Sequence, residues 1–367
     1  MHRIAYILFT CLLLGACSAE QEVAMTLPQE NDQLDFQTSV GNGSVVVYEQ
    51  NYFNPGDEIR ICCPEAHATP NFEDGADGMY IYTYKETILQ PENPDWSDWP
   101  YKFQPSASGG FSWRTLQPTS IYYVFEARHF PGKSYLRTVP VGQDKEEEFK
   151  NADMLIAHHR QILEKRGQAV QLTFHHAFAM VEITVKLPVS ETAAAGPYPE
   201  NALREVYMRS MLTGYTVNYS ETIDNDALRT VRGAAAEGVG DEGREDIRMY
   251  RVPIDEKEEF ETGTDDNGVP VKYQKYIFRG IVPEQDFLES GKEFLYFKVH
   301  QHGQSEEETT LYRFEPADKN LTLLSSHILA FRLDIKENEF DVAMIQAELL
   351  PWGRAEADME IGPKSEP

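Results

Sequence analysis

Paired histidines are the residues whose spacing most suggests metal chemistry. They occur as His158-His159, His175-His176 and His300-x-His302. Imidazole nitrogens bind zinc, and the two histidines of the last pair would share one face of a strand. A zinc site also needs a third or fourth ligand from elsewhere, whereas a histidine can sit in a sheet without any metal. We therefore predict no bound metal and no cofactor.

Clustered carboxylates offer a second kind of site, because calcium takes oxygen ligands from turns. Acidic turns occur at Glu73-Asp74, Asp77, Asp95, Asp98 and Asp265-Asp266-Asn267. None has the twelve-residue spacing and terminal glutamate of a calcium-binding helical loop. Solvated turns are the preferred interpretation, and a calcium bound by a loop stays open as the alternative.

Catalytic signatures are missing from the sequence. It contains no Gly-x-Ser-x-Gly, no His-Glu-x-x-His, no phosphate-binding glycine loop and no Cys-x-x-Cys. A hydrolase with two carboxylates across a cleft remains an alternative, although the sequence does not single out a pair. We predict that the protein is not an enzyme.

Aromatic residues gather between positions 96 and 113. The set comprises Trp96, Trp99, Tyr101, Phe103, Phe111 and Trp113. Such rings could stack on a glycan, with Trp96, Trp99 and Trp113 as the platform. They could equally form the core side of a hairpin, which we favour because aromatic side chains bury the largest areas.

The N-terminus has the features of a secretory signal. Met1-His2-Arg3 precedes an apolar run from Ile4 to Leu14, and Leu14-Gly15-Ala16 precedes Cys17. The apolar run is too short for a spanning helix, which needs about 20 residues. A branched apolar residue and two small residues before a cysteine resemble the bacterial lipobox. We predict that Cys17 is acylated and that the mature protein is lipid-anchored.

The net charge of the chain excludes one class of partner. The chain carries a formal charge of -27, which repels phosphate backbones and argues against nucleic-acid binding.

Beyond Cys17 only Cys62 and Cys63 remain in the mature chain. Adjacent strand residues point to opposite faces, so we expect one buried and one exposed thiol. A strained disulfide between them is the alternative.

Strand signals dominate the body of the chain, and they divide it into two parts. β-branched and aromatic runs alternate with Asn-Pro-Gly, Asp-Gly and Gly-Gly turns, a pattern typical of β-sandwiches. The fold class is therefore all-β. The expected organisation is a signal peptide at 1–16, a tether at 17–35, an N-terminal sandwich at 36–188, a linker at 189–200 and a C-terminal sandwich at 201–367. The alternation of apolar residues changes parity near His175-His176-Ala177, which predicts a bulge or bend where the strand changes neighbours.

Several segments resemble the fimbrillin family, the secreted lipoprotein pilins and pilus accessory proteins of anaerobic gut and oral bacteria. The matching segments are Gly109 to Trp113, Ile121 to Ala127 with Phe130-Pro131, Asp153 to Ala157, Leu172 to Val181, and Ser325 to Ile335 with Trp352. The resemblance implies two tandem β-sandwiches, export through a lipidated precursor, and a role in assembly or adhesion.

One departure from the family pattern concerns processing. Stalk pilins of the family are cleaved after an arginine near the start of the N-terminal domain, which removes a first strand and opens a groove for a neighbour's strand. Here Arg60 is the only basic residue between Cys17 and Lys85, and it lies in a strand-like run. Cleavage at Arg60 is therefore doubtful, and we expect an uncleaved anchor, accessory or tip subunit. A cleaved stalk pilin and a glycan-binding surface lipoprotein are the alternatives.

The expected partners are other pilin subunits, joined by strand addition, and the outer membrane, reached through the lipid anchor. A surface glycan or protein is a further possible partner. An open sheet edge accepts an added strand through main-chain hydrogen bonds. The alternation Phe340-Val342-Met344 could supply such a strand, although an ordinary closing strand of the second sandwich is the preferred interpretation.

Overall fold

The computed structural model of this chain describes residues 34, 36–40, 53–63, 70–85, 101–106, 109–116, 122–218, 230–235, 243–264, 268–287, 293–315, 321–334 and 343–351. Strands make up nearly all of the regular structure in these ranges. The helices there are α2 (Glu146–Asn151), α3 (Glu256–Glu259) and the 3-10 helix η1 (Leu163–Lys165). The predicted all-β fold class is confirmed. No helix of the described ranges has the length and apolar character needed to cross a membrane.

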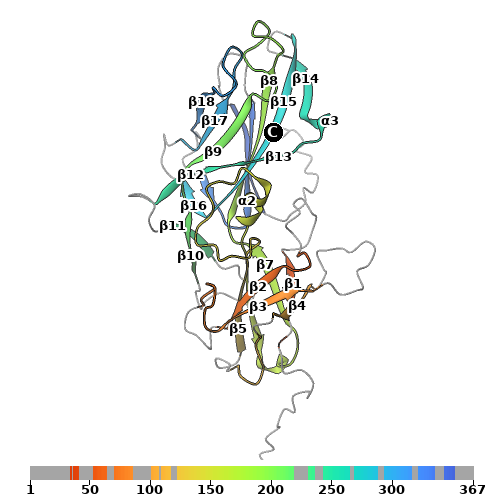
Figure 1. The fold of residues 1–367 in the computed structure, drawn as a ribbon, viewed down its shortest axis with the longest axis vertical. Helices are drawn as coiled ribbons and strands as arrows, with labels where there is room; N and C mark the ends of the chain where they lie inside the picture. Colours follow the sequence, from red (N-terminus) through yellow and green to blue (C-terminus); the bar gives the residue numbers. More distant parts are fainter. Residues whose placement is uncertain are drawn as a thin grey trace, which may run out of the picture.

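Seven strands of the N-terminal half form a closed barrel, seen in the lower part of Figure 1. Around the barrel the order is β1 (Phe36–Val40), β4 (Tyr101–Pro105), β3 (Met79–Tyr84), β2 (Glu58–Cys62), β5 (Tyr122–His129), β6 (Leu155–Ile162) and β7 (Val170–His176). β1 pairs antiparallel with β4 and parallel with β7. The sequence predicted a two-sheet sandwich here. The observed sheet instead closes on itself, because β1 joins the two edges that would otherwise remain open.

Aromatic side chains fill the barrel interior. Phe36 lies edge-on to Tyr82 and Phe125, with ring centroids 4.7 and 5.5 Å apart. The backbone passes close to this cluster at Gly110, where an added Cβ would lie 2.7 Å from the Tyr82 hydroxyl oxygen. That hydroxyl accepts a 2.8 Å hydrogen bond from the backbone N–H of Phe111. A glycine is therefore required at this position, because any side chain would displace the tyrosine.

Two larger sheets make up most of the other half, seen in the upper part of Figure 1. The four-stranded sheet contains β12 (Arg244–Arg248), β9 (Leu203–Leu212), β17 (Leu295–Val299) and β18 (Thr310–Phe314). The six-stranded sheet contains β13 (Tyr250–Val252), β15 (Pro270–Val282), β8 (Ala179–Val189), β20 (His327–Asp334) and β21 (Ala343–Pro351), with β14 (Phe260–Thr264) also paired to β15. Two small ribbons pair β10 (Gly214–Asn218) with β11 (Thr230–Ala234), and β16 (Gln285–Phe287) with β19 (Leu321–Leu323). Buried side chains of both large sheets, such as Val206 and Phe297 of one and Ile183 and Phe278 of the other, belong to a single hydrophobic core.

The chain passes from the barrel to the six-stranded sheet between β7 and β8. Val170, Leu172 and Phe174 of β7 belong to the barrel core, whereas Val181 and Ile183 of β8 belong to the core of the two larger sheets. Residues 177 and 178 separate the two strands. The change of parity read from the sequence thus marks the point where the strand exchanges neighbours.

The sheets divide the chain earlier than the expected domain limit at residue 188. β8 lies between β15 and β20 and pairs with both, so it is a central strand of the C-terminal half. The expected linker at 189–200 instead connects β8 of the six-stranded sheet to β9 of the four-stranded sheet. Tyr198 is buried there, and its carbonyl oxygen accepts a 2.8 Å hydrogen bond from the backbone N–H of Ser190. The Ala-Gly-Pro composition of this segment resembles that of a linker. The segment is nevertheless held in place by the hydrogen bond between Ser190 and Tyr198 and by the burial of Tyr198.

A third hydrophobic core joins the barrel to the six-stranded sheet. It combines Met154 and Ile156 of the N-terminal half with Met180 and Ile281 of the C-terminal half. Gln143 reinforces the junction, since its side chain donates to the Ile281 carbonyl oxygen at 2.8 Å and accepts from the Ile281 backbone N–H at 2.7 Å. The Gln143 side chain is fully buried, and its amide forms the same pair of hydrogen bonds with the Ile281 backbone that a residue of a neighbouring strand would form.

Candidate functional site

Arg60 lies at the centre of β2, an interior strand of the barrel. Its backbone is in register with Ile81 of β3 on one side and Arg128 of β5 on the other. A protease needs an extended segment that can leave its neighbours and enter the active site. The peptide bond after Arg60 is instead held between two paired strands.

The side chain of Arg60 is buried against the outer face of the barrel, with 4% of its surface exposed. Its Nη1 donates to the Phe72 carbonyl oxygen at 2.7 Å, and Nη2 donates to the Lys133 carbonyl oxygen at 2.8 Å. Nη2 also lies 2.6 Å from Oδ1 of the exposed Asp74, and the guanidinium sits 5.2 Å from the ring centroid of Phe130. Arg60 therefore holds two separate chain segments against the barrel.

The adjacent cysteines are free thiols, and both are buried. Cys63 faces the barrel core, as one side of a strand requires. Cys62 faces outward, where the sequence predicted exposure, but the segment around Asn71 and Phe72 covers it and Sγ donates to the Asn71 carbonyl oxygen at 3.2 Å. Burial raises the pKa of the Cys62 thiol to about 11.

Trp113 is the one residue of the proposed glycan platform inside the described ranges; Trp96 and Trp99 lie outside them. The indole is 2% exposed and packs edge-on against Tyr123, with ring centroids 5.2 Å apart. A ring buried in this way has no free face for a sugar, and its position agrees with the alternative that we preferred, a core residue.

The histidines of the described ranges contact other protein groups. His176 Nδ1 lies 2.8 Å from Oδ1 of Asp153, and both side chains are buried. His302 Nε2 lies 3.0 Å from the Ser190 carbonyl oxygen. No group of three or more His, Cys, Asp or Glu side chains in these ranges is arranged to hold a metal ion. Of the acidic turns, Glu73 and Asp74 pair with Arg137 and Arg60, whereas those at 95, 98 and 265–267 lie outside the described residues.

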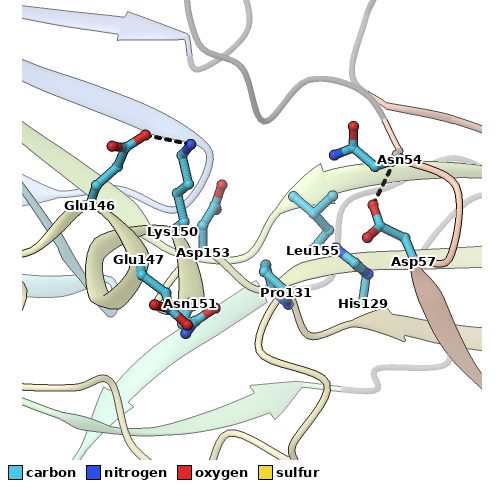
Figure 2. A pocket seen from close by; sticks show the side chains of 10 residues that line it. All are labelled: Asn54, Asp57, His129, Pro131, Glu146, Glu147, Lys150, Asn151, Asp153 and Leu155. Atoms are coloured by element: carbon cyan, nitrogen blue, oxygen red, sulfur yellow. Dashed lines mark hydrogen bonds and ion pairs between the residues drawn. The ribbon is translucent and has the colours of Figure 1, made fainter.

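A cavity of about 650 Å³ lies between the barrel and α2. Figure 2 shows its two sides facing each other, with Asn54, Asp57 and His129 from the barrel side and Glu146, Glu147, Lys150 and Asn151 from α2; Pro131, Asp153 and Leu155 complete the lining. Of these residues, only Pro131, Asp153 and Leu155 fall in segments that carry the family resemblance. The lining residues come from three separate stretches of chain, so no linear motif could have identified them.

Two polar side chains of this lining are buried: Asp153 is 1% exposed, and His129 is 6% exposed. His129 Nδ1 lies 2.8 Å from the Glu58 carbonyl oxygen. A carbonyl oxygen can only accept, so Nδ1 carries the hydrogen and donates it. Burial lowers the pKa of His129 more than the Glu58 carbonyl and the nearby carboxylates raise it. The ring is therefore neutral near pH 7, and its Nε2 is a hydrogen-bond acceptor.

Among the described residues, no strand pairs with the outer side of β18 or β21, which end the strand orders of the two large sheets. β21 pairs with β20 from His327↔Pro351 to Asp334↔Ala343, and Met344 lies opposite Leu333. Met344 thus belongs to a strand that closes its own sheet, whereas residues 340 and 342 lie outside the described ranges. Cys17 and the segments expected as signal peptide and most of the tether also lie outside them.

The chain matches no protein-family model and no curated protein sequence. Solved structures similar to it include a candidate cell adhesion protein from Bacteroides uniformis, 16% identical, with 89% of this chain and 99% of that chain covered and a TM-score of 0.49. A fimbrial assembly protein from Parabacteroides distasonis is 10% identical over 86% of this chain and 94% of its own, with a TM-score of 0.34. A tip fimbrial protein from Porphyromonas gingivalis is 8% identical over 87% and 99%, with a TM-score of 0.35.

Proposed function

We propose that the chain is a lipid-anchored protein of the outer-membrane surface that keeps its N-terminal strand and serves in fimbrial assembly and adhesion. The specific role is that of an anchor, accessory or tip subunit, with no enzymatic activity. The observation that carries this proposal is the position of Arg60, the only basic residue between Cys17 and Lys85, inside a paired and buried strand.

Processing at Arg60 would require the barrel to open. A protease would have to separate β2 from β3 and β5 before it reached the peptide bond. Cleavage would also detach β1, the strand that joins β4 to β7. The stalk pilins of the family that the sequence resembles lose a first strand in this way. A chain that is not cut at Arg60 keeps β1 and its covalent connection to Cys17, as a subunit that stays attached to its lipid would.

Other fimbrial subunits are the proposed partners, and the edges of β18 and β21 are the proposed places for strand addition. An edge strand offers a row of unpaired N–H and C=O groups to another chain. The formal charge of -27 makes a nucleic-acid partner unfavourable. The same negative charge repels anionic headgroups, so we attribute membrane attachment to the lipid on Cys17.

N-terminal sequencing and intact mass analysis of the protein from its native membrane test this proposal. We expect a blocked, acylated Cys17 and a mass that includes every residue from Cys17 onward. A free N-terminus at Ile61, in a soluble or polymeric fraction, would instead identify a cleaved stalk pilin and refute the proposal.

A further inference from the structure

Two tyrosines are stacked on the outer face of the four-stranded sheet. Tyr207 of β9 lies directly opposite Tyr296 of β17 in the strand register. Their ring centroids are 4.5 Å apart, and their ring planes differ by 12°. The adjacent residues Val206 and Phe297 belong to the hydrophobic core, so the two phenols are on the opposite side of the sheet, where both are partly exposed. A dissolved oxidant can therefore reach them.

Three charged side chains hold the two rings in this position. Lys298 Nζ lies 5.0 Å from the ring centroid of Tyr207, and the Arg209 guanidinium lies 5.2 Å from that of Tyr296. Each cation is attracted to the face of its ring, which disfavours rotation of the ring out of the stack. The Tyr207 hydroxyl also donates to Glu205 Oε2 at 2.8 Å.

Both tyrosines keep their phenolic protons near neutral pH. Partial burial raises the pKa of Tyr207, and the hydrogen bond to Glu205 raises it further. Partial burial also raises the pKa of Tyr296. A one-electron oxidation of either phenol therefore releases a proton together with the electron. Glu205 already accepts the hydrogen bond of Tyr207 and is positioned to take that proton.

We propose that Tyr207 and Tyr296 form an oxidative cross-linking site, at which peroxide and a peroxidase join the two rings as dityrosine. Each phenol loses one electron and one proton, the proton of Tyr207 passing to Glu205 and that of Tyr296 to water. The two phenoxyl radicals then form a carbon–carbon bond between positions ortho to their oxygens. Each ortho hydrogen moves to its oxygen as a proton, which restores both aromatic rings. One hydrogen peroxide takes up the two electrons and two protons and becomes two waters.

The stacked geometry favours coupling within one chain over coupling between chains. Phenoxyl radicals couple through contact of their rings, and these two rings are in contact before either is oxidised. The new bond would close a loop that runs from β9 through β15 to β17. Cross-links that close long loops restrict the unfolded chain most strongly, so the cross-linked protein should resist unfolding. This site goes beyond the proposed fimbrial role and does not depend on it.

Treatment of the full chain in detergent with a haem peroxidase and hydrogen peroxide tests the proposal. The protein is kept dilute, and gel filtration isolates the monomer. We expect the monomer to show dityrosine fluorescence and to yield a tryptic species in which peptides 205–209 and 293–298 are joined with the loss of two hydrogen atoms. Tyr207→Phe and Tyr296→Phe each keep the ring and remove the phenol, so each should lose this species. Tyr135→Phe is the matched control and should cross-link like the parent, because Tyr135 is also partly exposed but lies edge-on to Phe130.

Circular dichroism checks that the variants are folded, and loss of the joined species in either folded phenylalanine variant supports the site. Dityrosine found only in dimers and larger species, or undiminished in Tyr207→Phe and Tyr296→Phe, would overturn the proposal. Urea denaturation measures the consequence of the cross-link. The unfolding midpoint should rise after oxidation of the parent and stay unchanged in Tyr296→Phe, whereas an equal shift in both proteins would contradict the assigned loop closure.

Discussion

Truncation of Arg60 to alanine should destabilise the barrel far more than an ordinary surface substitution. The change removes two hydrogen bonds from a buried guanidinium and leaves the Phe72 and Lys133 carbonyl oxygens without that donor. Hydrogen bonds from charged groups contribute about 1.5–3 kcal/mol each. The contact with the Phe130 ring adds about 0.5–1 kcal/mol. The pair with Asp74 adds less than about 1 kcal/mol, because that carboxylate is 72% exposed.

We therefore expect Arg60→Ala to lower the free energy of unfolding by about 3–5 kcal/mol, in the range for breaking a buried polar network. Urea denaturation followed by tryptophan fluorescence measures this loss, since Trp113 reports on the barrel core. Arg137→Ala is the control. Arg137 is 73% exposed and pairs only with Glu73 among the described residues, so its loss should stay within about 0.5 kcal/mol.

A loss below about 1 kcal/mol for Arg60→Ala would refute this account, because it would mean that the guanidinium lies in solvent and holds nothing. The same variant also bears on processing. If Arg60 is not a cleavage site, the mature mass should change only by the substituted side chain, and the protein should stay in the membrane fraction.

Three further outcomes are expected. Cys17→Ala should move the protein from the membrane pellet to the soluble fraction, because lasting attachment needs several acyl chains; persistence in the pellet would contradict acylation at this residue. Limited proteolysis should spare residues 189–200, where Tyr198 is buried and bonded to Ser190, whereas a cut there with release of two separate fragments would show that this segment is a free linker. Iodoacetamide should not modify Cys62 in the native protein below about pH 9, because burial raises the pKa of this thiol to about 11; rapid native labelling at pH 8 would contradict its burial.

The alternation of apolar residues in the sequence predicted where the chain leaves one sheet and enters another. Parity changes near His175-His176-Ala177, and there the strand leaves the barrel and enters the six-stranded sheet. This feature was predictable because the side-chain period of a strand is two, so a single change of phase is visible in the residues themselves. The all-β class followed from the same local signals.

Closure of the barrel could not be predicted in this way. β1 pairs with β7 between residues 36–40 and 170–174, and no local pattern reports a partner so distant in the chain. The domain limit was placed too late for a related reason: Pro188 and the Ala-Gly-Pro composition after it resemble a linker, although residue 188 still pairs with Tyr273. Arg60 and Cys62 alternate with apolar neighbours as solvent-facing residues do. Their burial depends on the segment around Phe72, which covers them from elsewhere in the chain.

The parallel pairing of β1 with β7 would have a mechanical consequence if the proposed lipid anchor holds the protein at Cys17. A pull on that anchor would enter β1 at Phe36, and the opposing load from the rest of the molecule would leave β7 at His176, where the chain continues into β8. In a parallel pair these two ends lie at opposite ends of the ribbon. The five paired positions are then loaded together along the strand direction, and none can be peeled away before the others. Shear flow across a bacterial surface would therefore strain this joint in its strongest direction, and the subunit would yield only when the whole strand slid at once.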